Sequence, residues 1–408
     1  MKEIVIGLGQ GGGPTPVIND TLAGALDQAQ VEANERKINI RMLGFGNSAR
    51  ALMPRGEFID LAPFSGEIFR GVPGAALGTA RYKLEDRDMP CALERLKEKK
   101  INLVLWIGGN DTAENVAMLG RAVHASKTID NDLLLSHHTP GFGSAAKFHA
   151  MAARCLDLDL NSFAYSTMNR KEFPVSIYQT MGRETGWLAH LTAFAKFDEK
   201  GRYRADYAPH IIWPAELLFD EIKFLFALGK VLKDRKGILI VVSEGLKKIV
   251  DEEEVELAKI CGKVSTDAHG HSEYSRAGSG SAADYVANLV REFDKNLRTT
   301  IINPGHLQRC FARSETDAED AYKVGRESIR ALLEGDFGVS IVLKKTNGLI
   351  EPVRVPVERI AAQTRYVDHE FWDGDICGPN ELFFREFRPC LGYELALPRN
   401  LREIVSGI

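Results

Sequence analysis

The chain has 408 residues, which predicts two domains rather than one, and 44% of its residues are hydrophobic and 26% are charged, as in soluble globular proteins. Its net charge of −4 gives no basic surface for nucleic acid or an anionic membrane, no apolar run is long enough to span a bilayer, and residues 1–4 lead into a strand rather than a signal peptide. The six cysteines are scattered without a Cys-x-x-Cys pair, so we expect free thiols and a cytoplasmic protein.

The chain opens with a strand, a glycine-rich loop and a helix. Residues 4–8 are an apolar run that predicts a buried strand, and residues 19–36 predict the helix. Five glycines between positions 7 and 13 would let main-chain N–H groups approach an anion near the start of that helix. The same glycines satisfy G-x-G-x-x-G, but Pro14 and Pro16 delay the helix, whereas the dinucleotide motif runs directly into it. No P-loop sequence occurs here.

Apolar strands then alternate with helices, which predicts a parallel sheet covered on both faces. Further strands are predicted at residues 38–43, 103–107, 175–180, 237–242 and 339–343. Further helices are predicted at residues 88–99, from about 142 to 156, and at 187–197, 217–232 and 318–334.

Two polar segments follow strands in the first part of the chain. Residues 108–112 (GGNDT) lie where a strand ends and a helix begins, which is where doubly wound folds bind ligands; Thr112 can also cap that helix. Residues 126–132 (SKTIDND) combine a cation, two hydroxyls and two carboxylates. Carboxylates spaced i, i+2 point the same way in an extended segment, so one could accept a proton while the other helps to hold a divalent cation. A polar turn that caps a helix is the alternative.

Three further segments carry groups suited to a phosphorylated ligand. Residues 181–183 (MGR) and 243–245 (SEG) each follow a predicted strand. In residues 305–309 (GHLQR), His306 and Arg309 suit a phosphate dianion, because arginine offers a bidentate fork and histidine a second donor. An aspartate and two histidines within residues 267–271 could suggest a metal site, but nothing elsewhere supplies matched ligands.

Taken together and in this order, these segments resemble the phosphofructokinase family over roughly residues 4–345. The resemblance implies an α/β fold of two three-layer αβα domains, with the active site in the cleft between them. We expect residues 1–140, completed by part of 310–365, to form a phosphoryl-donor domain. Residues 141–309 would form a sugar-phosphate domain and residues 366–408 a C-terminal extension.

The resemblance also implies which residues bind and react. Donor contacts are implied for Gly12, Gly13, Arg81, Gly109, Asp111, Thr112 and Lys127. Sugar-phosphate contacts are implied for Thr128, Asp130, Met181, Gly182, Arg183, Glu244, His306 and Arg309. Asp130 would be the general base that accepts the proton of the 1-hydroxyl of fructose 6-phosphate. The further catalytic residues implied are Lys127, Thr128 and Arg183.

The implied cofactor is Mg²⁺, held by Asp132 and by the residue at position 110. The family's usual metal-coordinating aspartate is Asn110 in this chain, so this position offers an oxygen but no negative charge.

Two positions bear on the phosphoryl donor. In the family, ATP users usually have glycine where this chain has Asp111 and Lys127, and pyrophosphate users have aspartate and lysine. Asp111 places a carboxylate where ATP needs room for its α-phosphate, and Lys127 can grip the compact pyrophosphate anion. The resemblance therefore implies reversible phosphoryl transfer from pyrophosphate to fructose 6-phosphate, which gives fructose 1,6-bisphosphate and phosphate.

Three alternatives remain at this point. One is an ATP-dependent 6-phosphofructokinase, and another is a non-catalytic regulatory paralogue that binds sugar phosphate, an alternative that Asn110 keeps open. The third is a nicotinamide dehydrogenase, based on the glycine pattern alone. The expected partners are pyrophosphate, fructose 6-phosphate and further copies of the chain, with a dimer favoured, and neither nucleic acid nor a membrane.

Overall fold

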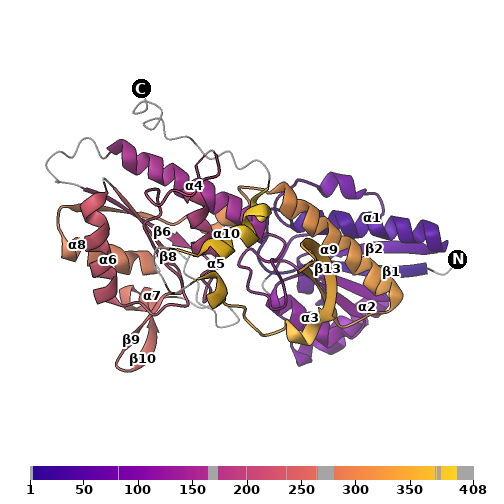
Figure 1. Ribbon diagram of the computed structural model, residues 1–408. Coiled ribbons are helices and arrows are strands. Elements are labelled where there is room, and N and C mark those ends of the chain that lie inside the picture. The colour runs from indigo at the N-terminus through magenta and orange to yellow at the C-terminus, as the bar shows by residue number, and fades with distance from the viewer. Residues whose placement is uncertain are drawn as a thin grey trace. The chain divides into compact units, whose positions relative to one another are not determined.

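The structure, a computed structural model, describes residues 3–80, 82–163, 173–198, 200–235, 237–262, 264, 280–372, 374 and 378–392. The chain forms two compact units (Figure 1). Unit 1 comprises Met1–Ser144 and Arg309–Arg365, and unit 2 comprises Ala145–Gln308 and Tyr366–Ile408. Residues 366–408, which we predicted as a C-terminal extension, are thus grouped with unit 2.

Unit 1 is built on a seven-stranded sheet in the order β13-β12-β5-β4-β1-β2-β3. The strands are β1 (Glu3–Gln10), β2 (Asn39–Phe45), β3 (Phe58–Asp60), β4 (Leu103–Gly108), β5 (Ala122–Ser126), β12 (Val339–Thr346) and β13 (Leu349–Pro356). The five inner strands pair in parallel, and the edge strands β3 and β13 pair antiparallel to their neighbours. The carboxyl ends of β1, β4 and β5 therefore meet at one edge of the sheet.

Helices cover both faces of this sheet. Helices α1 (Ile18–Arg36) and α9 (Glu315–Glu334) pack on one face, and α2 (Met89–Glu98) and α3 (Asn110–Leu119) pack on the other (Figure 1). In β4, Leu105 contributes to the core under α1 and α9, while Trp106 contributes to the core under α2 and α3. Every residue of β4 is buried, as expected for a strand covered on both faces.

Unit 2 has a smaller parallel sheet in the order β11-β6-β8-β7. The strands are β6 (Phe173–Thr180), β7 (Ile211–Trp213), β8 (Ile238–Ser243) and β11 (Leu297–Ile302). The longer helices are α4 (Phe142–Phe163), which begins in unit 1, α6 (Glu221–Asp234) and α8 (Ala282–Phe293). Helices α6 and α8 share one apolar core with the sheet. A hairpin of β9 (Lys247–Val250) and β10 (Glu253–Glu256) leads to α7 (Leu257–Cys261).

The end of the chain contributes an aromatic cluster to unit 2. Phe383 and Phe387 of α10 (Glu381–Phe387) lie against Trp187, with ring centroids 6.3 and 5.6 Å from it. Phe384 packs edge-on to Phe194 at 5.4 Å. These contacts tie α10, the last described α-helix, to α5 (Trp187–Leu191) and to the 3₁₀ helix η4 (Thr192–Lys196) that follows α5.

Several predicted elements differ from the structure, among them the helix predicted from about 142 to 156, which is α4 and ends at Phe163. The helix predicted at 187–197 is the short α5 followed by η4. The helix predicted at 217–232 begins at Glu221, because the carboxylate of Asp220 accepts a hydrogen bond from Lys223 N at 3.0 Å and caps it. The strand predicted at 4–8 continues to Gln10, because Gly9 leaves room for Trp106: a Cβ at Gly9 would lie 2.5 Å from Trp106 Nε1.

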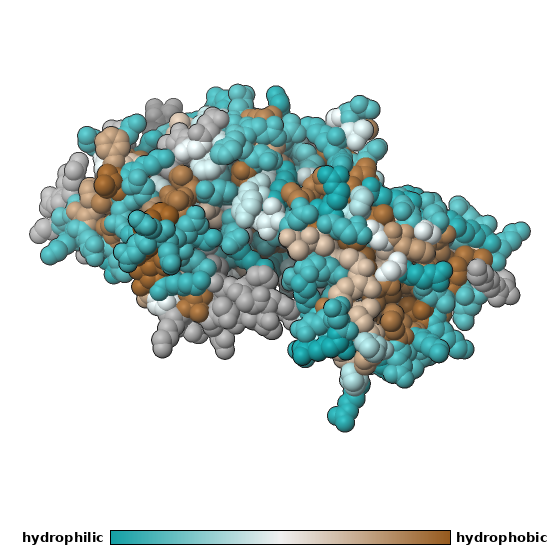
Figure 2. Space-filling view, turned by 90° about the horizontal axis from the view of Figure 1, so that it is seen from below, coloured by the Kyte–Doolittle hydropathy of each residue, from teal (hydrophilic) through white to brown (hydrophobic). Residues whose placement is uncertain are grey.

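The surface in view in Figure 2 is largely hydrophilic, with hydrophobic residues scattered over it. None of the helices in the described ranges combines the length and apolar character that crossing a membrane requires.

Candidate functional site

The glycine segment after β1 lies between two cationic side chains of unit 1. Gly11 N donates to Ile107 O at 2.7 Å, which ties the segment to the end of β4. Gly12 has a φ of +73°, a backbone conformation that favours glycine, and a Cβ there would lie 3.3 Å from Lys127 Nζ. At Gly13, a Cβ would lie 3.0 Å from Cζ of Arg309. The segment is therefore positioned to receive an anion.

Lys127 is a buried cation at the carboxyl end of β5. Its Nζ donates to Gly13 O at 2.8 Å, its main-chain N donates to Gly108 O at 2.9 Å, and the residue is 3% exposed. Burial, together with the nearby Arg309 charge, lowers the pKa of Lys127 to about 8. The carboxylates of Asp130, Asp132 and Asp111 act in the opposite direction on this pKa. An anion at this position would meet a cation that has no salt bridge to neutralise it among the described residues.

Residues 108–112 form the start of α3. Gly109 is the N-cap residue, and Asp111 lies in the first turn, where the helix dipole favours a carboxylate. Thr112 is buried against the glycines, since a Cβ at Gly11 or Gly108 would lie 2.4 or 2.1 Å from its Oγ1. The side-chain oxygen of Asn110 is buried and has no hydrogen-bond partner in the described part of the chain, so it is positioned to accept a ligand contact.

The segment that carries Asp130 and Asp132 is held by neighbouring loops. Thr128 N donates to Pro140 O at 3.1 Å, and Thr139 Oγ1 donates to Thr128 O at 2.8 Å. Arg365 N donates to Asp132 O at 2.8 Å. Two contacts from the neighbouring residues 139–140 and one from the distant Arg365 thus hold this segment in place.

The segment is not extended, so the condition under which its two carboxylates would point the same way is not met. Asn131, between the two aspartates, has a φ of +54°, and Asp130 N donates to Thr128 Oγ1 at 3.1 Å in a local turn. The i, i+2 geometry of a strand therefore does not align the carboxylates. Their common feature is instead their electrostatic interaction with Lys127.

In unit 2, two predicted segments lie side by side because β6 pairs in parallel with β8, with Thr180 opposite Ser243. Arg183 N donates to Glu244 Oε1 at 3.1 Å. Glu244 is buried and Arg183 is exposed with a φ of +51°, which is uncommon for a residue other than glycine and often marks a functional position. The predicted contact of Glu244 with the sugar phosphate stays a prediction; its contact with Arg183 N fixes the turn that presents Arg183.

Sequence reasoning missed Gln308, which supports the same turn. Its Oε1 accepts from Met181 N at 3.2 Å, its Nε2 donates to Gly305 O at 2.9 Å, and the side chain is buried. Gln308 lies in the 3₁₀ helix η5 (Gly305–Arg309), in which His306 is exposed. The signal in the sequence that could have identified Gln308 is its place inside the GHLQR segment.

Sequence reasoning also missed a buried amide pair beside the glycine segment. Gln10 Nε2 donates to Asn19 Oδ1 at 2.9 Å, and Gln10 Oε1 accepts from Leu77 N at 2.9 Å. Asn19 Nδ2 donates to Val72 O at 2.9 Å. The pair holds residues 72–77, after which Thr79 Oγ1 donates to Gly12 O. No local pattern in the sequence marks this pair.

The structure gathers the predicted residues into two groups. Around Lys127 in unit 1 are Gly12, Gly13, Gly109, Asn110, Asp111, Thr112, Thr128, Asp130, Asp132 and Arg309. In unit 2 are Met181, Gly182, Arg183, Glu244 and His306. Arg309, which we predicted with the sugar-phosphate residues, thus lies with the donor residues. Arg81 and residues 267–271 lie outside the described residues.

Comparison with known proteins finds similarity to the phosphofructokinase family over most of the chain. A family model described as Phosphofructokinase matches residues 5–332. The chain is 30% identical to pyrophosphate–fructose 6-phosphate 1-phosphotransferase of Rhodospirillum rubrum, over 97% of this chain and 96% of that protein. It is 31% identical to the protein of the same name from Xanthomonas campestris, over 95% of this chain and 91% of that protein. The solved structure of the pyrophosphate-dependent phosphofructokinase of Nitrosospira multiformis superposes on this chain with a TM-score of 0.79 and 25% sequence identity. The match covers 98% of this chain and 96% of that chain.

Proposed function

Because the chain belongs to the phosphofructokinase family, we propose that it transfers a phosphoryl group from inorganic pyrophosphate to the 1-hydroxyl of fructose 6-phosphate. Unit 1 would bind the donor and unit 2 the sugar phosphate. Relatives at about 30% identity carry a name that states this reaction, and each matches over most of its length.

The observation that carries the proposal is the setting of Lys127. Its ammonium group is buried beside Gly12 and Gly13, with the guanidinium of Arg309 against the same segment. Two cations at a glycine-rich segment suit a small, highly charged anion, because the glycines let it approach the main-chain N–H groups. Asp111 stands at the same place, where it would repel the additional phosphate of a nucleotide.

The residues of unit 1 can support the chemistry of transfer. Asp130 would accept the proton of the 1-hydroxyl as its oxygen forms a bond to phosphorus and the bridging P–O bond of pyrophosphate breaks. A positioned base contributes about 10²–10⁴-fold in rate. Lys127 and Arg309 would stabilise the charge on the transferred group and on the departing phosphate. In the reverse direction Asp130 returns the proton.

The side-chain oxygens of Asn110 and Asp132 also suit Mg²⁺ as ligands. Asn110 presents a buried oxygen without a hydrogen-bond partner among the described residues, and Asp132 supplies a carboxylate in electrostatic contact with Lys127. Oxygen ligands of this kind, few in number, fit a cation that keeps several waters and contacts phosphate oxygens. Bound there, Mg²⁺ would neutralise charge on the donor oxygens.

In unit 2, we assign the sugar phosphate to Arg183 and His306, which are both exposed. Arginine gives a bidentate fork for the 6-phosphate and histidine a further donor. Glu244 and Gln308 hold the main chain of residues 181–183, so they position this group.

The test is turnover of fructose 6-phosphate with Mg²⁺ and either pyrophosphate or ATP, followed by formation of fructose 1,6-bisphosphate. We expect turnover with pyrophosphate, and also release of pyrophosphate when fructose 1,6-bisphosphate and phosphate are supplied. Turnover with ATP and none with pyrophosphate would overturn the donor assignment. Binding of fructose 6-phosphate without turnover of either donor would favour a regulatory paralogue.

A further inference from the structure

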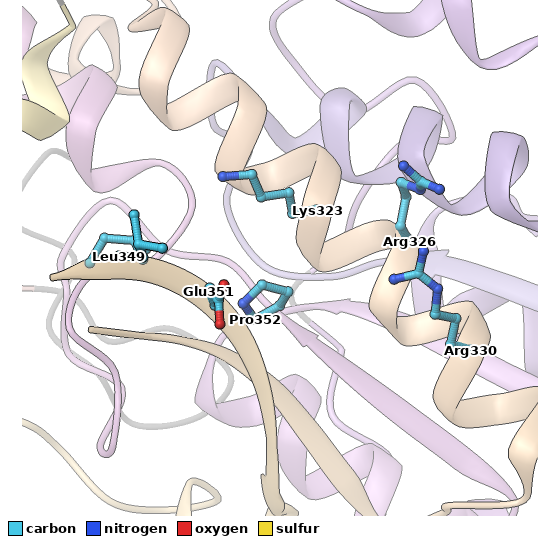
Figure 3. Close-up of a pocket in the computed structure, with 7 residues that line it drawn as sticks. Lys323, Arg326, Arg330, Leu349, Glu351 and Pro352 are labelled. Carbon is cyan, nitrogen blue, oxygen red and sulfur yellow. The ribbon is translucent and has the colours of Figure 1, made fainter. Parts of the chain in front are cut away.

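Helix α9 of unit 1 presents three cations along one face. Lys323, Arg326 and Arg330 follow the i, i+3, i+7 spacing that places side chains on the same side of a helix. They line a pocket of about 410 Å³ whose opposite wall is residues 349–352 of β13. Figure 3 shows the three cationic side chains along the helix and the β13 residues across from them.

Two of these cations converge on one neutral acceptor. Arg326 Nε donates to Gln28 Oε1 at 2.8 Å, and Arg330 Nη2 lies 3.4 Å from the same oxygen. Arg326 has no salt bridge with a carboxylate in the described ranges, and Arg330 has a long one, 3.4 Å to Glu327. Glu327 is itself shared with Arg354, at 2.7 Å. Arg326 therefore keeps charge and donors available at this point, beside Arg330, which also interacts with the carboxylates of Glu327 and Glu32.

The opposite wall is largely apolar. Ile350 packs against the core beneath α9, so the alternation of side chains along β13 directs Pro352 to the same side and Glu351 to the other. Ile350 and Pro352 therefore form the apolar part of this wall, and Leu349, on the same side of the strand as Glu351, is 64% exposed at the rim of the pocket. Glu351 is the single acidic residue in the pocket lining, against three cations.

We propose that this pocket binds a phosphate monoester that carries an apolar group. Two converging guanidinium groups match the oxygens of a phosphate dianion, since each can donate two parallel hydrogen bonds. The pocket volume lies in the range of small-molecule sites, about 300–1,000 Å³. A free phosphate ion would therefore leave most of the pocket empty. The apolar wall accounts for the remaining space.

The pocket is connected to the segment that carries Asp130. Lys323 Nζ lies 3.1 Å from Asp320 Oδ1, and Asp320 Oδ2 lies 3.2 Å from Nε2 of His138. The next residue, Thr139, donates to Thr128 O at 2.8 Å. A phosphate group bound in the pocket would attract Lys323 away from Asp320. Because Asp320 is connected through His138 and Thr139 to Thr128, we expect this binding to change kcat/KM for phosphoryl transfer to fructose 6-phosphate.

The test uses phenyl phosphate, which combines a phosphate dianion with an apolar ring and has no second phosphoryl group to donate. Its binding to the full chain is measured by calorimetry with fructose 6-phosphate present at saturation, so that a sugar-phosphate site is already filled. The double variant Arg326→Gln/Arg330→Gln removes the converging cations. Lys97→Gln/Arg359→Gln, at two exposed positions of unit 1, removes the same charge elsewhere.

We expect Kd to rise about tenfold or more in the first variant and to stay unchanged in the second, because charge-assisted hydrogen bonds are lost only in the first. Lys323→Gln, at a half-exposed side chain, provides a milder change and should raise Kd severalfold. Melting curves of all variants check that they are folded. No binding of phenyl phosphate to the wild-type chain, or the same Kd in both double variants, would overturn the site. An unchanged kcat/KM at saturating phenyl phosphate would overturn its connection to Thr128.

Discussion

The ammonium group of Lys127 lies 2.8 Å from the main-chain oxygen of Gly13 and donates a hydrogen bond to it. This contact joins the carboxyl ends of β5 and β1, two strands that β4 separates in the sheet. The acceptor is neutral, so it orients the cation without neutralising it. Burial of the ammonium group lowers its pKa to about 8. At pH 7 the group is still protonated, and its positive charge lies against the glycine segment.

The first prediction concerns stability and pH. The pKa of Lys127 is about 8 in the folded chain and near 10.5 in the unfolded chain, so the unfolded state binds the proton more tightly. Below pH 8 this difference destabilises the wild type, by on the order of 3 kcal/mol at about 1.4 kcal/mol per pKa unit. Stability is recovered as pH rises from 8 to 10.5. Lys127→Met should therefore be more stable than wild type at pH 7, by a margin that shrinks towards pH 10.5.

Melting temperatures of both proteins across this pH range provide the measurement. Lys97→Met, at an exposed lysine, serves as the control and should differ from wild type by the same small amount at every pH. A margin for Lys127→Met that does not vary with pH would contradict the prediction.

A second prediction concerns the general base. Asp130→Asn should lower kcat by about 10²–10⁴-fold, because the amide cannot accept the proton of the 1-hydroxyl. Binding of fructose 6-phosphate should change little, since a base acts mainly in the transition state. Arg183→Gln is the matched comparison: it removes a predicted phosphate contact and should weaken sugar-phosphate binding. If Asp130→Asn kept the wild-type kcat, the base would lie elsewhere.

A third prediction concerns the choice of donor. Asp111 and Lys127 interact electrostatically and would share one ligand, so their substitutions should not be additive. We expect Asp111→Gly and Lys127→Gly each to reduce kcat/KM for pyrophosphate. Use of ATP should appear most clearly in Asp111→Gly or in the double variant, because the carboxylate that repels the α-phosphate is absent. Kinetics with both donors in all four proteins test this, and unchanged pyrophosphate kinetics in both single variants would show that these residues do not set the donor.

A fourth prediction concerns Asp317, which stabilises the start of α4. Its buried carboxylate accepts from Gly141 N and Ser144 N, each at 2.9 Å, and from Ser144 Oγ. Asp317→Ala should lower the free energy of unfolding by about 2–4 kcal/mol, because each buried donor without an acceptor costs about 1–3 kcal/mol. Glu319→Ala, which removes a surface salt bridge from the same helix, should cost less than about 1 kcal/mol. Urea unfolding of the two variants compares them, and equal losses would argue against the capping role.

Much of the fold and the position of its polar segments could be predicted from the sequence. The apolar runs that became β4 and β8 are buried on both faces, and their hydrophobic pattern is a local property of the chain. The segments at 108–112 and 243–245 follow these strands directly, so their place at the carboxyl ends of the sheets followed from chain order alone. The short α5 did not, because packing overrode local propensity, and the turn at Asn131 was one of two conformations that the sequence left open.

Only the tertiary structure decided which of these segments meet. Arg309 lies beside Gly13, Gln308 accepts from Met181 N, and Asp317 caps the start of α4. Each contact joins residues more than 100 positions apart and depends on which strands pair and on which helix covers which face. The hydrophobic pattern of a segment specifies that it is buried but not the partner against which it packs, so the local sequence determined the parts of the site and the pairing of the strands determined their arrangement.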